Sequence, residues 1–198
     1  DYPYLSSSAN QIFDITVGIA ASSAMSASSP ISQQEKKINI YNQMAQVLAG
    51  HDHTGSIQLF DEDGNILAGG TKLRECYFFN FARLLSKDEI KKGSFSMELG
   101  NAVAFATANN TRLTITDAGA QNDFRVNSPA GEYGILSASA GEPAGVTSGL
   151  CGLIYYQAGI AVVTASVFRN VAKSDGKAEY NPTVVIYETG SSSVLFLT

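Results

Sequence analysis

The sequence GLCGLIYYQAGIAVVTASVF, residues 149–168, decides the fold. It carries no charge and is about as long as a membrane-spanning helix, which needs roughly 20 apolar residues. Two glycines and Gln157 interrupt it, however, and many of its apolar residues are β-branched or aromatic, which favours extended backbone. We therefore predict a hairpin, with strands over 150–156 and 160–168 and a turn at 157–159. A membrane helix is the weaker alternative, because no basic cluster flanks the run to orient it.

A hairpin this apolar must be covered on both faces, either by its own chain or by another subunit. Contiguous apolar patches larger than several hundred Å² are rare on soluble monomers. We therefore expect a neighbouring subunit to complete part of the surface. Val163 is the position that decides between the two arrangements, since it faces either a neighbour or its own core.

Charged side chains are scarce, at 16% of 198 residues against roughly a quarter in a typical soluble domain. The surface of the folded protein is therefore either neutral and polar or buried in an assembly. The formal net charge of −5 argues against binding to nucleic acid, which needs a basic face, and against attachment to anionic lipid. We expect a single β-rich domain over residues 1–198, with a Ser/Ala-rich connecting segment at 20–30.

The clearest helix is predicted over residues 32–49. Ser32 and Glu35 have the spacing of a capping box, and Gly50 supplies a C-terminal stop. Apolar residues at spacings of three and four give the helix one buried face, which Met44 and Val47 widen. The members of this face are Ile38, Tyr41, Ala45 and Leu48.

Strand patterns fill most of the remaining chain, and the aromatic run at 76–82 is the best candidate for a central strand. Ser86 and Glu89 form a second capping box ahead of Gly93, so we expect one or two helical turns over 86–92. Further strands are predicted at 12–18, 56–59, 94–99, 112–116, 133–136, 183–188 and 193–197. The fold class is therefore mainly β, with antiparallel sheets in a sandwich or barrel-like arrangement and one clear helix.

Two cysteines, Cys76 and Cys151, stand far apart in apolar contexts. We expect buried thiols, because folds that depend on disulfides are small and rich in cysteine. A single bridge between the two cysteines is the alternative.

Two short motifs resemble metal sites. His51 and His53 would face the same side of an extended chain, but a site needs at least one more ligand, so an exposed loop is the better interpretation. Asp61, Asp63 and Asn65 resemble the start of a calcium loop, yet the expected Gly and Glu are missing further on. We predict a hairpin turn there, leading into residues 66–67.

Other catalytic and modification motifs are weaker. Ser174 and Lys177 match a Ser/Lys nucleophile spacing, but they lie in a polar turn pattern and not at a helix start. Asn109 begins a glycosylation sequon without any sign of secretion. No phosphate-binding or dinucleotide-binding loop occurs. We therefore predict no catalytic, cofactor-binding or metal-binding residues, and we expect no enzymatic activity.

Four segments together resemble virion structural proteins of large contractile-tailed bacteriophages, especially marine ones. They are KINIYNQMAQVL at 37–48, the aromatic strand running into FAR at 81–83, KDEIKKGSF at 87–95 and GLIYYQAGIAVV at 152–163. This resemblance covers about half of the chain. It implies a tail, baseplate, neck or capsid-surface component of the virion. Its partners would be other virion proteins and further copies of itself, with no nucleic acid, membrane or small-molecule substrate.

Two other functions stay open. A carbohydrate- or receptor-binding β domain would expose aromatic residues beside Asp and Asn in loops, for example at Tyr133 or at Tyr180 and Asn181. A hydrolase with an unrecognised catalytic pair is the other possibility. A glycan screen tests the first function, and a broad activity panel tests the second.

Overall fold

The computed structural model describes seven segments of the chain: residues 13–26, 32–65, 70–85, 88–102, 112–139, 149–168 and 194–197. Within these segments the protein is mainly β, with one α-helix and two short 3-10 helices. In this part of the chain, no helix combines the length and the hydropathy that a bilayer crossing needs.

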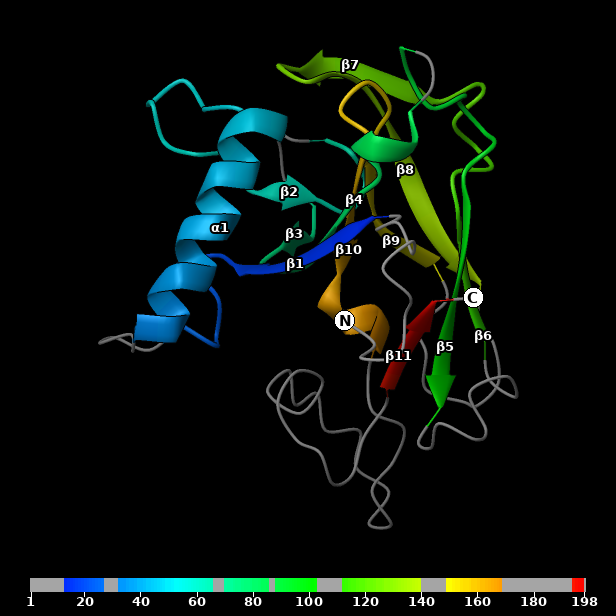
Figure 1. Cartoon of the computed structure of the whole chain (residues 1–198). Helices are drawn as coiled ribbons and strands as arrows, with labels where there is room; N and C mark the ends of the chain where they lie inside the picture. Colours follow the sequence, from blue (N-terminus) through cyan, green and yellow to red (C-terminus); the bar gives the residue numbers. More distant parts are fainter. Residues whose placement is uncertain are drawn as a thin grey trace.

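Nine antiparallel strands form one sheet that curls into a half-barrel (Figure 1). The order across the sheet is β1-β4-β10-β9-β8-β6-β5-β11, and β7 pairs with β8. The strands are β1 (Asp14–Ile19), β4 (Glu75–Asn80), β5 (Ser96–Ala102), β6 (Arg112–Thr116), β7 (Phe124–Ser128), β8 (Gly131–Ser139), β9 (Gly149–Tyr155), β10 (Ile160–Thr164) and β11 (Val194–Leu197).

The predicted apolar hairpin forms the centre of this sheet. Strands β9 and β10 pair in antiparallel register, with Ile160 opposite Tyr155. The second strand is shorter than predicted, because Ala165–Phe168 forms the 3-10 helix η3. The hydroxyl oxygen of Thr164 accepts a hydrogen bond from the backbone N–H of Ser166, and such local side-chain bonds compete with strand pairing.

Both faces of the hairpin are covered by its own chain. Leu153 and Tyr155 point toward the helix side of the sheet, whereas Ile154 and Val163 point into the curl. All four are fully buried. Val163 therefore faces its own core, which is the second of the two arrangements considered. In sequence alone this cover is not visible, because residues that belong to the two cores, such as Tyr41 on one face and Leu99 on the other, are distant along the chain.

Helix α1 (Ser32–Leu48) packs on the outer side of the sheet. Tyr41, Ala45 and Leu48 are buried as predicted, but Val47 is 63% exposed. Val47 lies about 200° around the helix from Ala45, so it points away from the sheet. Gly18 in β1 permits the close approach of the helix, because a Cβ there would lie 2.9 Å from the backbone nitrogen of Tyr41.

A second, small sheet pairs β2 (Phe60–Asp61) with β3 (Lys72–Leu73). The predicted turn at residues 61–65 thus belongs to a hairpin, although its return strand lies further along than residues 66–67, which fall outside the described segments. The predicted strand over 56–59 is limited to an isolated bridge between Ile57 and His51.

The prediction of helical turns over 86–92 is wrong for the described residues, 88–92, which form bends and turns. The short 3-10 helix η1 lies just before them, at Ala82–Leu84. Backbone N–H groups of this region bond to distant partners, as Ile90 does to the carbonyl oxygen of Tyr156. These tertiary bonds take the donors that a helix would use.

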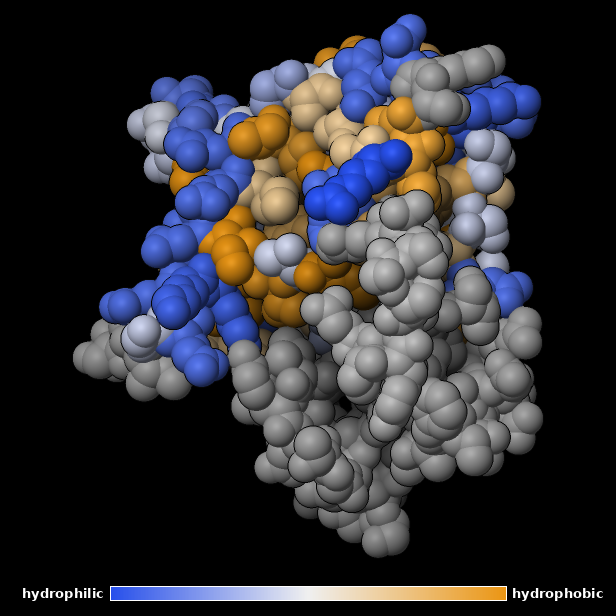
Figure 2. Space-filling model, in the orientation of Figure 1, coloured by the Kyte–Doolittle hydropathy of each residue, from blue (hydrophilic) through white to orange (hydrophobic). Residues whose placement is uncertain are grey.

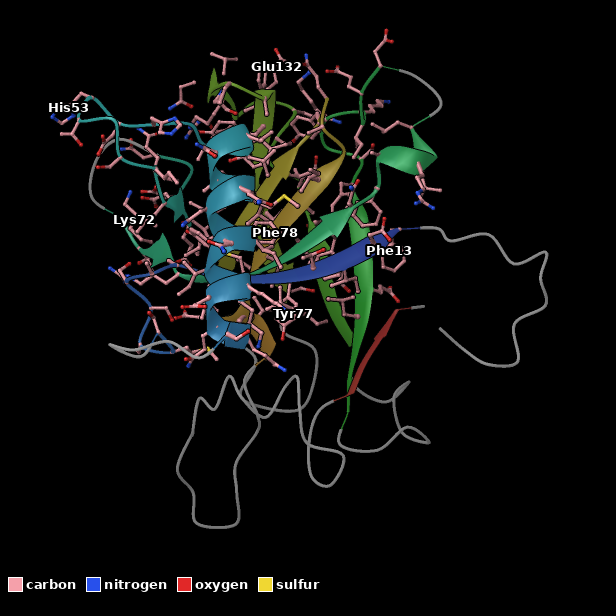
Figure 3. The ribbon with its side chains drawn as sticks, turned by 60° about the vertical axis from the view of Figure 1, so that its left-hand side comes forward. Phe13, His53, Lys72, Tyr77, Phe78 and Glu132 are labelled. Carbon is pink, nitrogen blue, oxygen red and sulfur yellow. The ribbon has the colours of Figure 1, made fainter. Side chains whose placement is uncertain are left out.

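Apolar residues form two cores, one on each face of the sheet. Successive residues of a strand point to opposite faces, so Phe78 packs under α1 while Tyr77 points into the curl (Figure 3). The predicted strands at 94–99, 112–116, 133–136 and 193–197 match β5, β6, β8 and β11. The predicted strand at 183–188 lies outside the described residues, and β7 was not predicted.

Candidate functional site

The buried carboxylate of Asp117 organises a polar region of the described structure. Asp117 directly follows β6 and is fully buried. Its oxygens accept hydrogen bonds from the N–H groups of Gly93 (2.8 Å) and Phe95 (2.9 Å) and from the hydroxyl of Tyr156 (3.0 Å). Three donors satisfy the charge, as a buried carboxylate requires. This arrangement fixes the segment around Gly93 against the end of β9.

Lys92 directly precedes Gly93 in the chain, and two acids hold its side chain. Its ammonium forms ion pairs with Glu89, at 3.2 Å, and with Glu132 at the start of β8. The nitrogen also lies 5.1 Å from the ring centre of Phe124 and 5.5 Å from that of Tyr156, which are cation–π distances.

The hydrogen bond with Glu132 is the main reason that the pKa of Lys92 is raised. Lys92 therefore stays protonated and acts as a fixed positive charge. It is not poised as a general base, which would need a lowered pKa.

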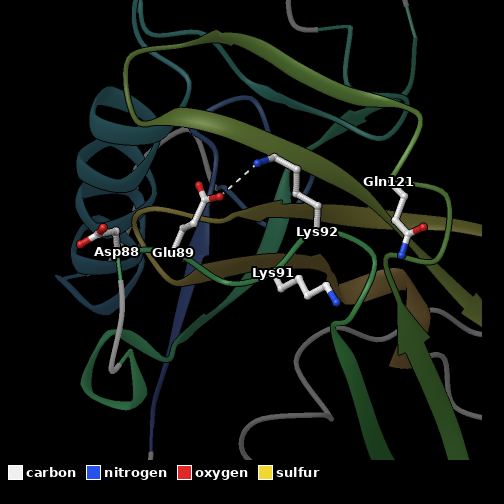
Figure 4. A pocket seen from close by; sticks show the side chains of 5 residues that line it. All are labelled: Asp88, Glu89, Lys91, Lys92 and Gln121. Atoms are coloured by element: carbon white, nitrogen blue, oxygen red, sulfur yellow. Dashed lines mark hydrogen bonds and ion pairs between the residues drawn. The ribbon is translucent and has the colours of Figure 1, made fainter.

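A shallow open depression of about 530 Å³ lies over these residues (Figure 4). In Figure 4, Glu89 and Lys92 point toward one another, while Gln121 lies at one end of the depression and Asp88 at the other. Every lining side chain carries a hydrogen-bond donor or acceptor. The lining residues are Asp88, Glu89, Lys91, Lys92 and Gln121. We name this depression the Lys92 dish.

The aromatic residue at the edge of this region is Phe124. It is 38% exposed and follows Asn122 and Asp123, which are exposed loop residues. An exposed aromatic residue beside Asp and Asn is the pattern expected of a carbohydrate-binding loop, but it occurs here at a position that the sequence analysis did not name. Tyr133, which we named for that role, is fully buried, so that choice is wrong. Tyr180 and Asn181 lie outside the described residues.

The histidine motif forms an exposed loop, as predicted. Asp52 accepts hydrogen bonds from the N–H groups of Thr54 (2.8 Å) and Ser56 (2.9 Å) and from the hydroxyl of Thr54 (2.6 Å). The bond from that hydroxyl is the largest cause of the lowered pKa of Asp52. His53 lies at the tip of the loop, away from the sheet (Figure 3). Across the described segments, no group of three or more potential metal ligands comes together.

The motif that resembles a calcium loop forms a turn, as predicted. Asp61 is fully buried and forms an ion pair with Lys72. The N–H of Asp63 bonds to Asp61, and the N–H of Asn65 bonds to Asp63. This last bond is the main cause of the lowered pKa of Asp63. These two carboxylates therefore accept hydrogen bonds from the backbone of the turn and stabilise its conformation.

Both cysteines are buried free thiols, which confirms the first of the two alternatives. Cys76 belongs to the core under α1 and Cys151 to the core inside the curl, so the sheet separates them. Burial raises the pKa of Cys151 to about 12 and that of Cys76 well above its ordinary value. The motifs at Ser174, Lys177 and Asn109 lie outside the described residues.

The sequence contains no pattern that predicts the Lys92 dish. Lys92 and Glu132 are 40 positions apart, and Asp117 meets Gly93 across 24 positions. The only local signal is the charged run at 87–92, which by itself favours a helical turn. No known protein family, curated protein or solved structure matches this chain.

Proposed function

We propose that this chain is a structural subunit of a bacteriophage particle, in the tail, baseplate, neck or capsid surface, that works by assembling with other virion proteins and with itself. The segments at 37–48, 81–83, 87–95 and 152–163 support this proposal through their resemblance to virion proteins. The structural observation that carries it is the outer edge of β1, which pairs with no other strand of the described segments.

Strand β1 ends the sheet, and half of its backbone groups point outward. Ala20 donates to the carbonyl oxygen of Arg74 at 2.6 Å, which fixes the hydrogen-bonded pairs in the register with β4. Because such pairs alternate along antiparallel strands, Thr16 and Gly18 bond toward β4. The N–H and C=O groups of Ile15 and Val17 therefore face away from β4. Within the described segments no other strand pairs with β1.

Within the described residues, the edge of β1 lacks several of the features that block pairing with another chain. Natural edge strands carry Lys, Pro or a bulge that blocks further strands. The sequence of β1, DITVGI, contains neither Lys nor Pro, and its register with β4 is unbroken over six residues. Ile15 is 40% exposed. Figure 2 shows hydrophobic surface on the face along which β1 runs.

Replacement of Ile15 by proline tests this edge directly. Because the N–H of residue 15 points away from β4, Ile15→Pro removes an outward donor and leaves the pairing with β4 intact. Ile15→Ala is the matched control, since it trims the side chain and keeps the N–H. In analytical ultracentrifugation we expect oligomers for the wild type and for Ile15→Ala, and monomers for Ile15→Pro. A wild type that stays monomeric at high concentration would count against assembly through β1.

The place of the chain in a particle needs a separate experiment. Mass spectrometry of gradient-purified phage particles should find this protein at a stoichiometry of many copies per particle. Imaging of the particle should then locate the fold within it. If the protein is made during infection but is missing from purified particles, the proposal fails.

A further inference from the structure

We propose that the Lys92 dish is a binding site for a neutral, hydroxyl-rich ligand, that is, a mono- or disaccharide. The inference rests on the side chains of the dish and does not depend on assembly through β1. It adds a ligand-binding function to a chain whose proposed role is structural.

The charge balance of the dish favours a neutral ligand. Asp88 and Glu89 contribute two negative charges, and Lys91 and Lys92 contribute two positive charges. Glu132, which forms an ion pair with Lys92, adds a third negative charge beside the lining residues, so these five groups together carry a net charge of −1. The net negative charge repels an anion, and the exposed ammonium of Lys91 repels a cation, so this mixed set of charges attracts neither strongly. A neutral ligand avoids both penalties.

The polar end groups of the lining side chains can pair with the hydroxyl groups of a ligand. A sugar hydroxyl both donates and accepts, so it can pair with the carboxylates, with the ammonium of Lys91 or with the amide of Gln121. Gln121 is well placed for this, because its side chain packs over Gly93, where a Cβ would collide with it. The absence of a Cβ at residue 93 thus leaves room for the amide at the end of the dish.

The base of the dish is rigid, which lowers the cost of binding. Asp117 holds the backbone of Gly93 and Phe95, while Glu89 and Glu132 hold the ammonium of Lys92. Phe124, which is 38% exposed, lies beside Lys92 but is not one of the lining residues. Groups fixed in advance lose little entropy when the ligand arrives.

The size and shape of the dish limit the ligand and its affinity. A volume of about 530 Å³ lies within the range of small-molecule sites. The dish is open to solvent, however, so each new hydrogen bond replaces one to water and raises the affinity only about fivefold to tenfold. We therefore expect weak binding, with dissociation constants in the millimolar range.

Nuclear magnetic resonance titration of the ¹⁵N-labelled full chain tests the proposal. The probes are glucose, galactose, N-acetylglucosamine, lactose and chitobiose, together with the charged sugars glucose 6-phosphate and glucosamine. We expect saturable shifts with at least one neutral sugar, confined to the side-chain amide of Gln121 and to the backbone of residues 88–93 and 121–124. Charged analogues of that sugar should bind more weakly. No saturable shift with any neutral sugar, shifts elsewhere on the protein, or tighter binding of a charged analogue would overturn the proposal.

Two variants of neighbouring amide side chains localise the binding. Gln121→Ala removes a lining amide and should weaken binding about tenfold. Asn122→Ala removes the adjacent exposed amide, which is not one of the described lining residues, and should change binding by less than about twofold. Equal effects of the two variants would contradict the assignment. Unchanged dispersion of the other amide signals verifies the fold, and Ile15→Pro should bind the sugar like the wild type.

Discussion

The hydroxyl of Tyr156 donates a hydrogen bond of 3.0 Å to the carboxylate of Asp117, and both side chains are fully buried. Asp117 follows β6, whereas Tyr156 follows β9, so the bond joins two strands that are not neighbours in the sheet. The same carboxylate also accepts from the backbone of Gly93 and Phe95. One buried side chain therefore determines the conformation of the segment that carries Lys92.

Removal of this carboxylate should strongly destabilise the protein. Asp117→Ala leaves one buried and two partly buried donors without an acceptor, and we expect the free energy of unfolding to fall by about 3 kcal/mol. Tyr156→Phe is the matched control, because it removes one donor and leaves the two backbone bonds, at a cost of about 1 kcal/mol. Urea denaturation followed by circular dichroism measures both values. Equal costs for the two variants would show that the backbone bonds to Asp117 contribute little.

Local patterns in the sequence predicted those helices and strands whose buried side chains recur at regular spacings along the chain. The apolar run at 149–168 indicated the central hairpin, and the spacing of Tyr41, Ala45 and Leu48 indicated the buried face of α1. The aromatic run at 76–82 indicated β4, which lies between β1 and β10. In these elements the spacing of the apolar residues determines both the local conformation and the face that packs against the core.

The sequence failed where partners distant in the chain decide the conformation. The capping box at Ser86 and Glu89 indicated a helix, but bonds from Gly93 to Asp117 and from Ile90 to Tyr156 hold described residues 88–92 in turns. Strand β7, with the sequence FRVNS, is mostly exposed and shows no apolar alternation strong enough to predict it. The Lys92 dish depends on such contacts throughout, so no local pattern indicates it.

The hairpin should not tolerate a methyl group at Gly152. A Cβ at this position would collide with the backbone carbonyl of Val162 in the paired strand. Because backbone cannot give way as a flexible side chain does, Gly152→Ala should destabilise by several kcal/mol, about 3 or more. Gly119→Ala is the control, since a Cβ there meets nothing within 4 Å. Thermal melts of the two variants give the comparison, and a Gly152→Ala protein that melts like Gly119→Ala would contradict the close approach of β9 and β10.

Two neighbouring tyrosines should respond differently to loss of the hydroxyl. The hydroxyl of Tyr155 is buried and has no hydrogen-bond partner among the described residues. That of Tyr133 lies 2.8 Å from the carbonyl oxygen of Gly64 and 2.6 Å from Oδ1 of Asn127. Tyr155→Phe should therefore be neutral or stabilising, whereas Tyr133→Phe should cost about 1 to 2 kcal/mol. A larger loss for Tyr155→Phe than for Tyr133→Phe in urea denaturation would refute this assignment.

The two thiols should be unreactive in the folded protein. Cys76 and Cys151 are 1% exposed and lie on opposite sides of the sheet. Since the thiolate is the reactive form and burial raises both pKa values, a thiol reagent should label neither residue at neutral pH. Both should react once denaturant unfolds the chain. Fast labelling of the native protein, or a disulfide seen after oxidation without unfolding, would contradict this placement.

Alkaline conditions should unfold the protein, because burial raises the pKa of the same thiols and of five tyrosines. The pKa values of Tyr77 and Tyr133 rise to about 12, and those of Tyr41, Tyr155 and Tyr156 also rise, in each case chiefly through desolvation. In the unfolded chain thiols ionise near 9.0 and tyrosines near 10.0. Below these values both states are protonated, and the stabilisation is fully present.

Above these values the unfolded state loses protons that the folded state keeps, so the free energy of unfolding falls as pH rises. The loss should begin near pH 9 and become steeper above pH 10, by up to about 1.4 kcal/mol per pH unit for each group. Urea midpoints across this range measure the slope. Phenolate absorbance of the native protein is the control, because the five buried tyrosines should ionise only as the chain unfolds. Stability that stays constant through pH 11, or titration of these tyrosines near 10 while the fold persists, would show that their hydroxyls are open to water.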